Sequence, residues 1–285
     1  MMKSFRLRLL AGFTGFAVMR LAAALCLVTL LGMLAVVFVN ALPAVSWAFL
    51  TEAPRNMMSE GGIWPCIAGT FLLAAGALLI ALPLGVASAV YLNEYRSESP
   101  AMTVVRLSIA NLAGVPSIVF GLFGLTFFVV FCGFGVSLLS GVLTLAVLSL
   151  PIIINTTETA LKQIPQDWRE ASLALGATRR ETILKVLLPN ALPGILTGAI
   201  LALARAAGET AAIMYTGAVF FTPKNSVSLF EPVMALPYHV YVMATSGTNI
   251  EATRPLQYGT ALVLVVLVFV MSLAAIILRE RRRAR

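Results

Sequence analysis

Apolar positions gather in long blocks along the chain, and short polar segments separate the blocks. Six blocks reach about 20 residues, the length that crosses a bilayer as an α-helix. They cover residues 21–42, 67–91, 104–131, 138–161, 192–220 and 256–278. The pattern predicts an all-α polytopic membrane bundle with about six transmembrane helices.

Composition supports a membrane protein. Hydrophobic residues make up 60% of the 285 positions and charged residues 11%, which is more apolar surface than a soluble core of this length can bury. The net charge of +8 would also suit a nucleic-acid-binding protein, but such a protein carries its basic face on a polar domain. Here the basic residues flank the apolar blocks, which favours a membrane and no nucleic acid.

Basic residues also predict the orientation. With the N-terminus inside, sixteen of the twenty lysines and arginines fall in the cytoplasm, and only Arg55, Lys224 and Arg254 fall outside. By the positive-inside rule both termini are cytoplasmic. We expect three parts: residues 1–20, a basic segment that can lie along the inner interface; residues 21–278, the transmembrane domain; and residues 279–285, a basic tail. The first block is longer than the apolar region of a usual signal peptide and is expected to stay as a helix.

The cytoplasmic loop over about residues 162–191 has strong helix signals. Pro165 suits a first helical turn, and Gly176 can end that helix in the left-handed conformation. Thr178 and Glu181 have the spacing of a capping box that begins a second helix, which Pro189 is expected to end. The loop is therefore predicted to be two short helices joined at a glycine corner.

One face of the first loop helix offers a narrow ridge. Helical spacing brings together Trp168, Ala171, Ser172 and Leu175. Such a ridge fits recognition of a helix in a partner's groove. The alternative is a hairpin packed on its own bundle.

Two charges lie inside the fifth block. Arg205 and Glu209 are four residues apart, and each charge at mid-membrane costs about 2.5 to 3.5 kcal/mol, so they are candidates for the substrate path. This spacing places them on one helical face, where each can partly neutralise the other, and a purely structural ion pair is the alternative. Gly208 thins the helix beside them and Thr210 adds a hydroxyl.

The chemistry of this pair favours a protonated oxyanion. Arginine is a permanent cation that matches tetrahedral oxyanions. Hydrogen phosphate can donate a hydrogen bond to Glu209, whereas sulfate has no proton to give and is repelled. The hypothesis is selection of phosphate over sulfate.

Other features are weaker. Gly114 and Pro116 predict a break in the third block that either lines a cavity, with Ser117 adding a hydroxyl, or only kinks the helix. Glu158 and Lys162 are expected to pair where the fourth block ends. The lone His239 is expected at the surface. The three cysteines lack metal-site spacing, although a disulfide between Cys66 and Cys132 is allowed.

The cytoplasmic loop resembles a known family motif. Its elements are Glu170, Ala171 and Ser172, then Gly176 three residues on, and then Val186, Leu188 and Pro189. This order resembles the EAA loop of binding-protein-dependent ABC importer permeases, with Ser172 for alanine and Val186 for isoleucine. The resemblance implies a type I (MetI-like) permease fold and a loop that seats in a cleft of the ATPase subunit. Because the chain has no GxxxxGK[ST] motif, ATP is expected to be hydrolysed by another polypeptide, with no cofactor or metal bound here and no enzyme activity in this chain.

A second resemblance concerns the cargo. The stretch RAAGETA around Arg205 is similar to phosphate importer permeases, as are residues 61–70, 83–95 and 111–122. The GETA form and modest length are closer to PstA-type than to PstC-type permeases. Asn155 stands where such permeases often carry arginine, so an uncharged contact is implied there. The implied partners are a PstC-like permease, two PstB-like ATPases and a periplasmic PstS-like phosphate-binding protein, in a bacterial inner membrane. Permeases for sulfate, molybdate or phosphonate, and an ion-coupled secondary transporter, stay open as alternatives.

Overall fold

A computed structural model describes residues 2–55, 60–95, 99–222, 228–246 and 250–283. The elements in chain order are α1 (Met2–Ala41), α2 (Trp47–Thr51), β1 (Pro54–Arg55), β2 (Glu60–Gly61), α3 (Trp64–Val90), η2 (Tyr91–Tyr95), α4 (Pro100–Ala113), α5 (Ser117–Gly124), η3 (Leu125–Phe131), α6 (Leu138–Lys162), α7 (Gln166–Ala174), α8 (Arg179–Glu181), η4 (Thr182–Leu187), α9 (Leu188–Gly208), η5 (Ile213–Tyr215), α10 (Leu236–Ser246) and α11 (Ile250–Arg283). The two strands form one short antiparallel pair with Pro54 opposite Gly61. The predicted all-α bundle is confirmed.

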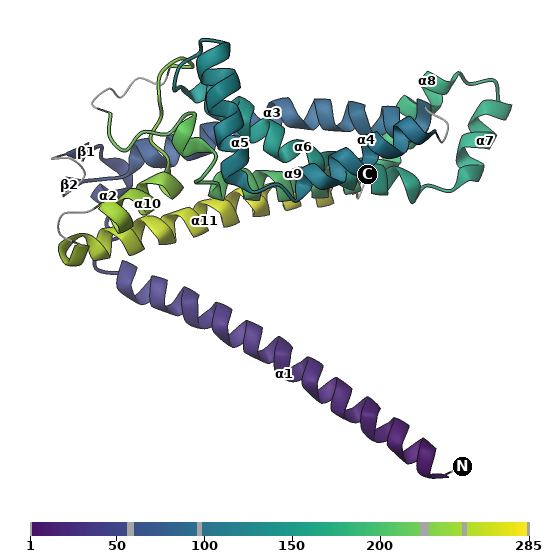
Figure 1. The fold of residues 1–285 in the computed structure, drawn as a ribbon, viewed down its shortest axis with the longest axis horizontal. Helices are drawn as coiled ribbons and strands as arrows, with labels where there is room; N and C mark the ends of the chain where they lie inside the picture. Colours follow the sequence, from purple (N-terminus) through teal and green to yellow (C-terminus); the bar gives the residue numbers. More distant parts are fainter. Residues whose placement is uncertain (1, 56–59, 96–98, 223–227, 247–249, 284–285) are drawn as a thin grey trace.

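Three long helices form the centre of the bundle. α3 packs against α6 and α9, α6 packs against α9, and α11 covers α9 from the side (Figure 1). Leu73, Leu145 and Ile153 lie in their shared core and are almost fully buried. A Cβ at Gly194 or Gly198 of α9 would collide with α6, so these glycines allow the two backbones to approach closely.

Five helical stretches in the described part of the chain are long and apolar enough to cross a membrane. They are Gly15–Ala41, Trp64–Tyr95, Leu138–Lys162, Arg179–Gly208 and Thr253–Glu280. A sixth span exists if α4 and the α5–η3 helix count as one, and these two are bent by 102°. About six spans were predicted, and the count agrees.

The ends of the bundle differ. α2, α10 and the strand pair lie at one end, and α7 and α8 lie at the other (Figure 1). The C-terminal end of α1 touches α11, and the rest of α1 extends away from the bundle. The apolar stretch of α1 is therefore exposed. The start of α1 and the end of α11 both point toward the α7 end.

Two minor expectations change. His239 on α10 is buried, with 3% of its surface exposed, and its ring stacks on Phe220; the expectation of a surface histidine was wrong because α10 packs into the bundle between α3 and α11. Cys66 is buried in α3, and it and Cys132 are both free thiols, so the allowed disulfide is not formed.

Candidate functional site

The third span is broken between α4 and α5. α4 ends at Ala113, Pro116 occupies the residue before α5 with φ −58° and ψ 141°, and Ser117 begins α5 half-buried. Proline disfavours helical backbone in the residue before it, which explains why the chain cannot continue α4 through this point. The predicted break is present, and at 102° it is a sharp turn of the chain rather than a packing kink.

The fifth span is also broken, and here the prediction of one helix across 192–220 was wrong. α9 ends at Gly208, and Glu209 has an extended backbone with φ −75° and ψ 126°. Its carboxylate Oε1 accepts hydrogen bonds from the N–H groups of Ala211 and Ala212, at 3.1 and 3.4 Å. Glycine weakens the helix and a carboxylate that caps the next turn stabilises the break.

Arg205 and Glu209 therefore do not share a helical face. Arg205 is exposed on the last turn of α9, and no carboxylate among the described residues lies within ion-pair distance of its guanidinium. The Oε1 atom of Glu209 is occupied by backbone N–H groups, while Oε2 has no partner among the described residues. The structural ion pair, which was the alternative interpretation, is not formed.

The segments that follow the two breaks contact each other. Gly121 of α5 faces the backbone of Ala211 and Ala212, where a Cβ would be only 2.9 Å from the carbonyl oxygen of Ala211. Phe120, Ala212 and Ile213 belong to the same buried core. Broken helices near the middle of a bundle are typical of binding sites for charged cargo in transporters.

The remaining predicted path residues are only partly brought together. Gly208 faces open space and Thr210 is half-buried, next to Glu209 in the chain. Asn155 is exposed on α6, and its neighbour Thr156 packs on Gly198 of α9. Gly198 precedes Arg205 by seven residues, roughly 10 Å along the helix axis. Asn155 therefore lies about two turns closer to the α7 end than Arg205 does.

The two-helix loop has the predicted caps. Gly176 follows α7 with φ +86°, the left-handed conformation expected of it. The side chain of Thr178 accepts a hydrogen bond from the Glu181 N–H at 3.3 Å, and the Glu181 carboxylate accepts one from the Thr178 N–H at 3.0 Å. The capping box is complete.

The second loop helix does not end at Pro189, contrary to expectation. Helical structure continues from α8 through the π-helical turn η4 into α9, with Leu188 and Pro189 in the first turn of α9. Proline is tolerated there because the wider π turn changes the hydrogen-bond pattern just before it. The loop is thus joined without interruption to the span that carries Arg205.

The ridge on α7 is mostly free. Trp168 and Leu175 are 47% and 90% exposed, and Glu170 and Ala171 are also exposed. Ser172 instead turns inward, and its hydroxyl lies 2.9 Å from the hydroxyl of the buried Thr182 in η4. Three of the four ridge side chains, and Glu170 beside them, remain available to a partner, and Ser172 attaches α7 to η4.

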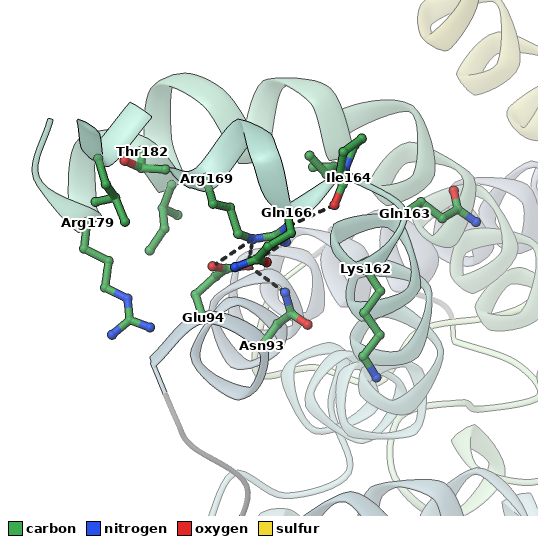
Figure 2. A pocket seen from close by; sticks show the side chains of 12 residues that line it. Asn93, Glu94, Lys162, Gln163, Ile164, Gln166, Arg169, Arg179 and Thr182 are labelled. Atoms are coloured by element: carbon green, nitrogen blue, oxygen red, sulfur yellow. Dashed lines mark hydrogen bonds and ion pairs between the residues drawn. The ribbon is translucent and has the colours of Figure 1, made fainter. Parts of the chain in front are cut away.

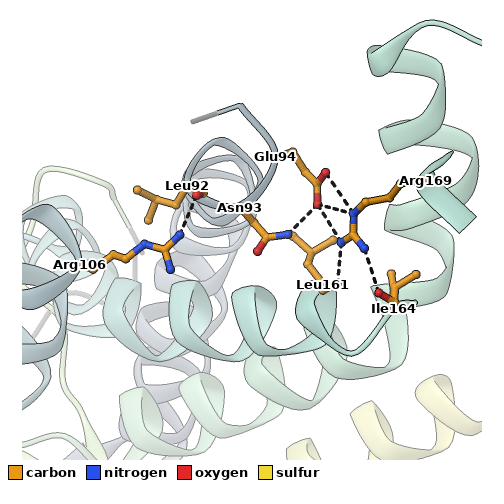
Figure 3. A network of polar contacts seen from close by, with 7 residues as sticks. All are labelled: Leu92, Asn93, Glu94, Arg106, Leu161, Ile164 and Arg169. Atoms are coloured by element: carbon orange, nitrogen blue, oxygen red, sulfur yellow. Dashed lines mark hydrogen bonds and ion pairs between the residues drawn. The ribbon is translucent and has the colours of Figure 1, made fainter. Parts of the chain in front are cut away.

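A buried ion pair was missed by the sequence reasoning. Arg169 on α7 and Glu94 in η2 have side chains only 13% and 8% exposed, and Arg169 donates to the Glu94 carboxylate with N–O distances of 3.0 to 3.4 Å (Figure 3). The pair lines a cavity of about 670 Å³ under α7 (Figure 2). Removing one member of such a pair typically destabilises a protein by about 3 to 5 kcal/mol. The partners are 75 residues apart, and no local pattern links them.

A second charged cluster lies near the end of α6. Lys162 contacts Glu158 at 2.8 Å, as predicted from their spacing. Glu158 also accepts a hydrogen bond from Arg106 of α4, which in turn donates to the carbonyl of Leu92 at 2.9 Å. Glu158 thus links α4 and α6 at the same end of the bundle as Glu94.

Fold and site together define a membrane permease: a helical bundle with an exposed, capped loop at one end and, in the last turn before a helix break, an arginine that has no carboxylate partner among the described residues. Residues 81–284 match the family described as "Binding-protein-dependent transport system inner membrane component", and the chain belongs to this family. It is an ABC importer permease of the inner membrane. Such a permease works with a separate ATPase subunit and a substrate-binding protein, and it is not itself an enzyme.

Individual relatives agree with this assignment. The chain is 35% identical over 266 residues to the probable ABC transporter permease YqgI of Bacillus subtilis, covering 90% of each chain. It is 37% identical to the phosphate transport system permease PstA of Xylella fastidiosa, covering 82% of this chain and 80% of the relative. Among solved structures, an inward-facing form of the MetNI methionine ABC transporter matches with a TM-score of 0.59 and 26% identity, over 78% of this chain and 94% of that one.

Proposed function

We propose that this chain is the permease subunit that carries inorganic phosphate through an ATP-driven importer. The observation that carries the proposal is the exposed Arg205 without a carboxylate partner in the described structure, in the last turn of α9 before a helix break. A cation left unpaired inside a membrane span is expected to serve a charged cargo. The names of relatives such as the Xylella PstA support phosphate as that cargo.

Each path residue has a proposed role. Arg205 binds the phosphate oxygens through its guanidinium, and the free Oε2 of Glu209 accepts the proton of hydrogen phosphate. Gly208 leaves space for the ion, since nothing lies within 4 Å of its Cβ position. Thr210, Ser117 and Asn155 add uncharged hydrogen-bonding groups along the route.

The proposed assembly has several partners. A PstC-like permease encloses the path together with this chain. Two PstB-like ATPases bind the cytoplasmic loops of the two permeases, one of them at the exposed ridge of α7. A periplasmic PstS-like protein delivers phosphate to the opposite end. Both termini lie in the cytoplasm. The positive-inside pattern supports this orientation. The start of α1 and the end of α11 also point toward the α7 end of the bundle (Figure 1).

The test is phosphate-stimulated ATP hydrolysis and phosphate uptake by the complex in proteoliposomes. Arg205→Ala is expected to leave the ATPase bound and to lower phosphate uptake by about a hundredfold or more, because a charged hydrogen bond is worth about 1.5 to 3 kcal/mol and Arg205 can form two. Glu170→Ala is expected to weaken ATPase binding instead. Normal uptake by Arg205→Ala would refute the phosphate site, and uptake of sulfate, molybdate or phosphonate in place of phosphate would assign a different oxyanion.

A further inference from the structure

Arg169 lies one residue before Glu170 on α7 but points the other way. Its side chain runs under the helix toward the membrane spans, where it meets Glu94 (Figure 3). No residue of α7 is itself buried, and the cavity of about 670 Å³ separates much of the helix from the bundle (Figure 2). Among the described residues, the side-chain bonds that hold α7 to the rest of the chain are the Ser172–Thr182 contact with η4 and the contacts of Arg169.

The guanidinium group of Arg169 connects three parts of the chain at once. It donates to both carboxylate oxygens of Glu94 in η2, which continues α3. It also donates to the carbonyl of Leu161 at the end of α6 and to that of Ile164 in the following linker, both at 2.9 Å. Only the planar fork of arginine can serve this many acceptors, since a lysine ammonium has three donors on one atom.

Glu94 is held in position for this contact. The side chain of Asn93 donates to Glu94 Oε1 at 2.6 Å, and η2 prolongs α3 without a break. The carboxylate is thus attached to a long helix that packs along α6 and α9. A displacement of α7 passes through Arg169 to α3 and α6 together.

We propose that Arg169 and Glu94 are positioning residues for energy coupling: their ion pair makes α7 move as one body with α3 and α6 when the ATPase subunits close. The inference rests on the proposed function only in taking α7 as the ATPase contact. It assigns to Arg169 a role distinct from docking, because its side chain is only 13% exposed and faces away from the ridge.

The first experiment needs no cargo. Spin labels are placed at Ala87 on α3 and Asp167 on α7, both exposed, in the full complex with its native cysteines replaced. The distance between the labels is expected to be equal in the nucleotide-free and ATP-bound states of the parent protein. In Arg169→Lys the distance distribution should broaden. A parent distance that shifts with ATP contradicts the proposal.

The second experiment measures phosphate moved per ATP hydrolysed. Arg169→Lys keeps the charge but loses the fork, and Glu94→Gln keeps the shape but loses the charge. Both variants are expected to retain the bound ATPase and to lower the ratio about tenfold, which lies in the usual range of coupling free energies. Arg279→Gln is the matched control, because Arg279 bonds Thr197 across α11 and α9 at 3.2 Å without touching α7; its ratio should be unchanged.

The outcomes separate the two proposals. A normal ratio in either variant, or loss of the ATPase subunit from both, would overturn the coupling role of Arg169. If phosphate fails to stimulate ATP hydrolysis by the parent complex, the assignment of phosphate as cargo is wrong. The coupling role of Arg169 is still tested in that case, because the label distances do not depend on the cargo.

Discussion

Glu209 directly follows the last helical residue of α9, and its two carboxylate oxygens have different surroundings. Oε1 accepts the N–H groups of Ala211 and Ala212, while Oε2 is left without a partner in the described structure. Glutamine can keep the first set of contacts through its amide oxygen. The change Glu209→Gln therefore isolates the negative charge from the shape of the helix break.

We expect Glu209→Gln to reduce the preference for phosphate over sulfate by about tenfold, since a hydrogen bond to a charged group is worth about 1.5 to 3 kcal/mol. The variant loses the anionic acceptor of the phosphate proton and the charge that repels sulfate. The measurement is radiolabelled phosphate uptake with increasing sulfate, with Glu280→Gln at an exposed position of α11 as the control. Unchanged competition by sulfate would count against this role.

Local spacing identified some charged contacts and missed others. The Glu158 and Lys162 contact follows from helical spacing, and Arg205 stood out as a charge within an apolar block. Arg106 and Arg169 find their acceptors only because α4 and α7 pack beside distant elements. A single sequence carries no signal for such pairs, which depend on tertiary structure.

At the scale of elements, the corner after α7 depends on one glycine. Gly176 has φ +86°, and nothing lies within 4 Å of its Cβ position, so a side chain there meets strain but no collision. An L-residue in this conformation costs roughly 1 to 2 kcal/mol. The strain can be relieved only by turning α7 relative to α8.

Gly176→Ala is therefore expected to weaken binding of the ATPase subunit by about tenfold, because the strain of roughly 1 to 2 kcal/mol must be overcome to keep α7 in its binding position. Gly176→Asn should bind better than Gly176→Ala, because asparagine tolerates the left-handed conformation. Titration of the purified ATPase against the reconstituted permease measures both. Gly32→Ala on α1, also in open space but in ordinary helix, is the control and should bind normally. Equal affinity for Gly176→Ala and the parent would show that the corner geometry is not needed.

Helix boundaries marked by a local cap pattern, such as Gly176 and Thr178, were easier to predict than boundaries without such a pattern. Thr178 and Glu181 form the predicted capping box because both groups are close in sequence. The end of α9 at Gly208 and its continuity through Pro189 were not predicted. Both depend on features that hydropathy does not carry: a side-chain cap by Glu209 and a π-helical turn before α9.

At the scale of the whole molecule, hydropathy predicted the spans well but not how they are placed. The apolar blocks became helices because backbone polar groups must be satisfied within each span. Apolar character alone does not distinguish a core helix such as α6 from α1, whose apolar stretch is exposed. The burial of α10, which brings His239 into the bundle, was not predicted, because apolar character does not show which helices pack in the core.

His239 makes the stability of the folded chain depend on pH. Neither ring nitrogen has a hydrogen-bond partner in the described structure, and burial lowers the pKa of His239 from 6.5 to about 4. Between these values the unfolded chain binds a proton that the folded chain does not. Stability is therefore lost as the pH falls from about 6.5 to 4, by roughly 3 kcal/mol in total.

The apparent Tm of the purified protein in detergent, measured from pH 7.5 to 4.5, tests this effect. The parent Tm should fall more steeply below pH 6.5 than that of His239→Leu, because leucine fills the buried space without a titrating group. At pH 7.5 the leucine variant should be at least as stable as the parent, since it removes two unsatisfied polar atoms that each disfavour burial. Parallel Tm profiles for the two proteins would mean that His239 is hydrated or paired in the folded protein.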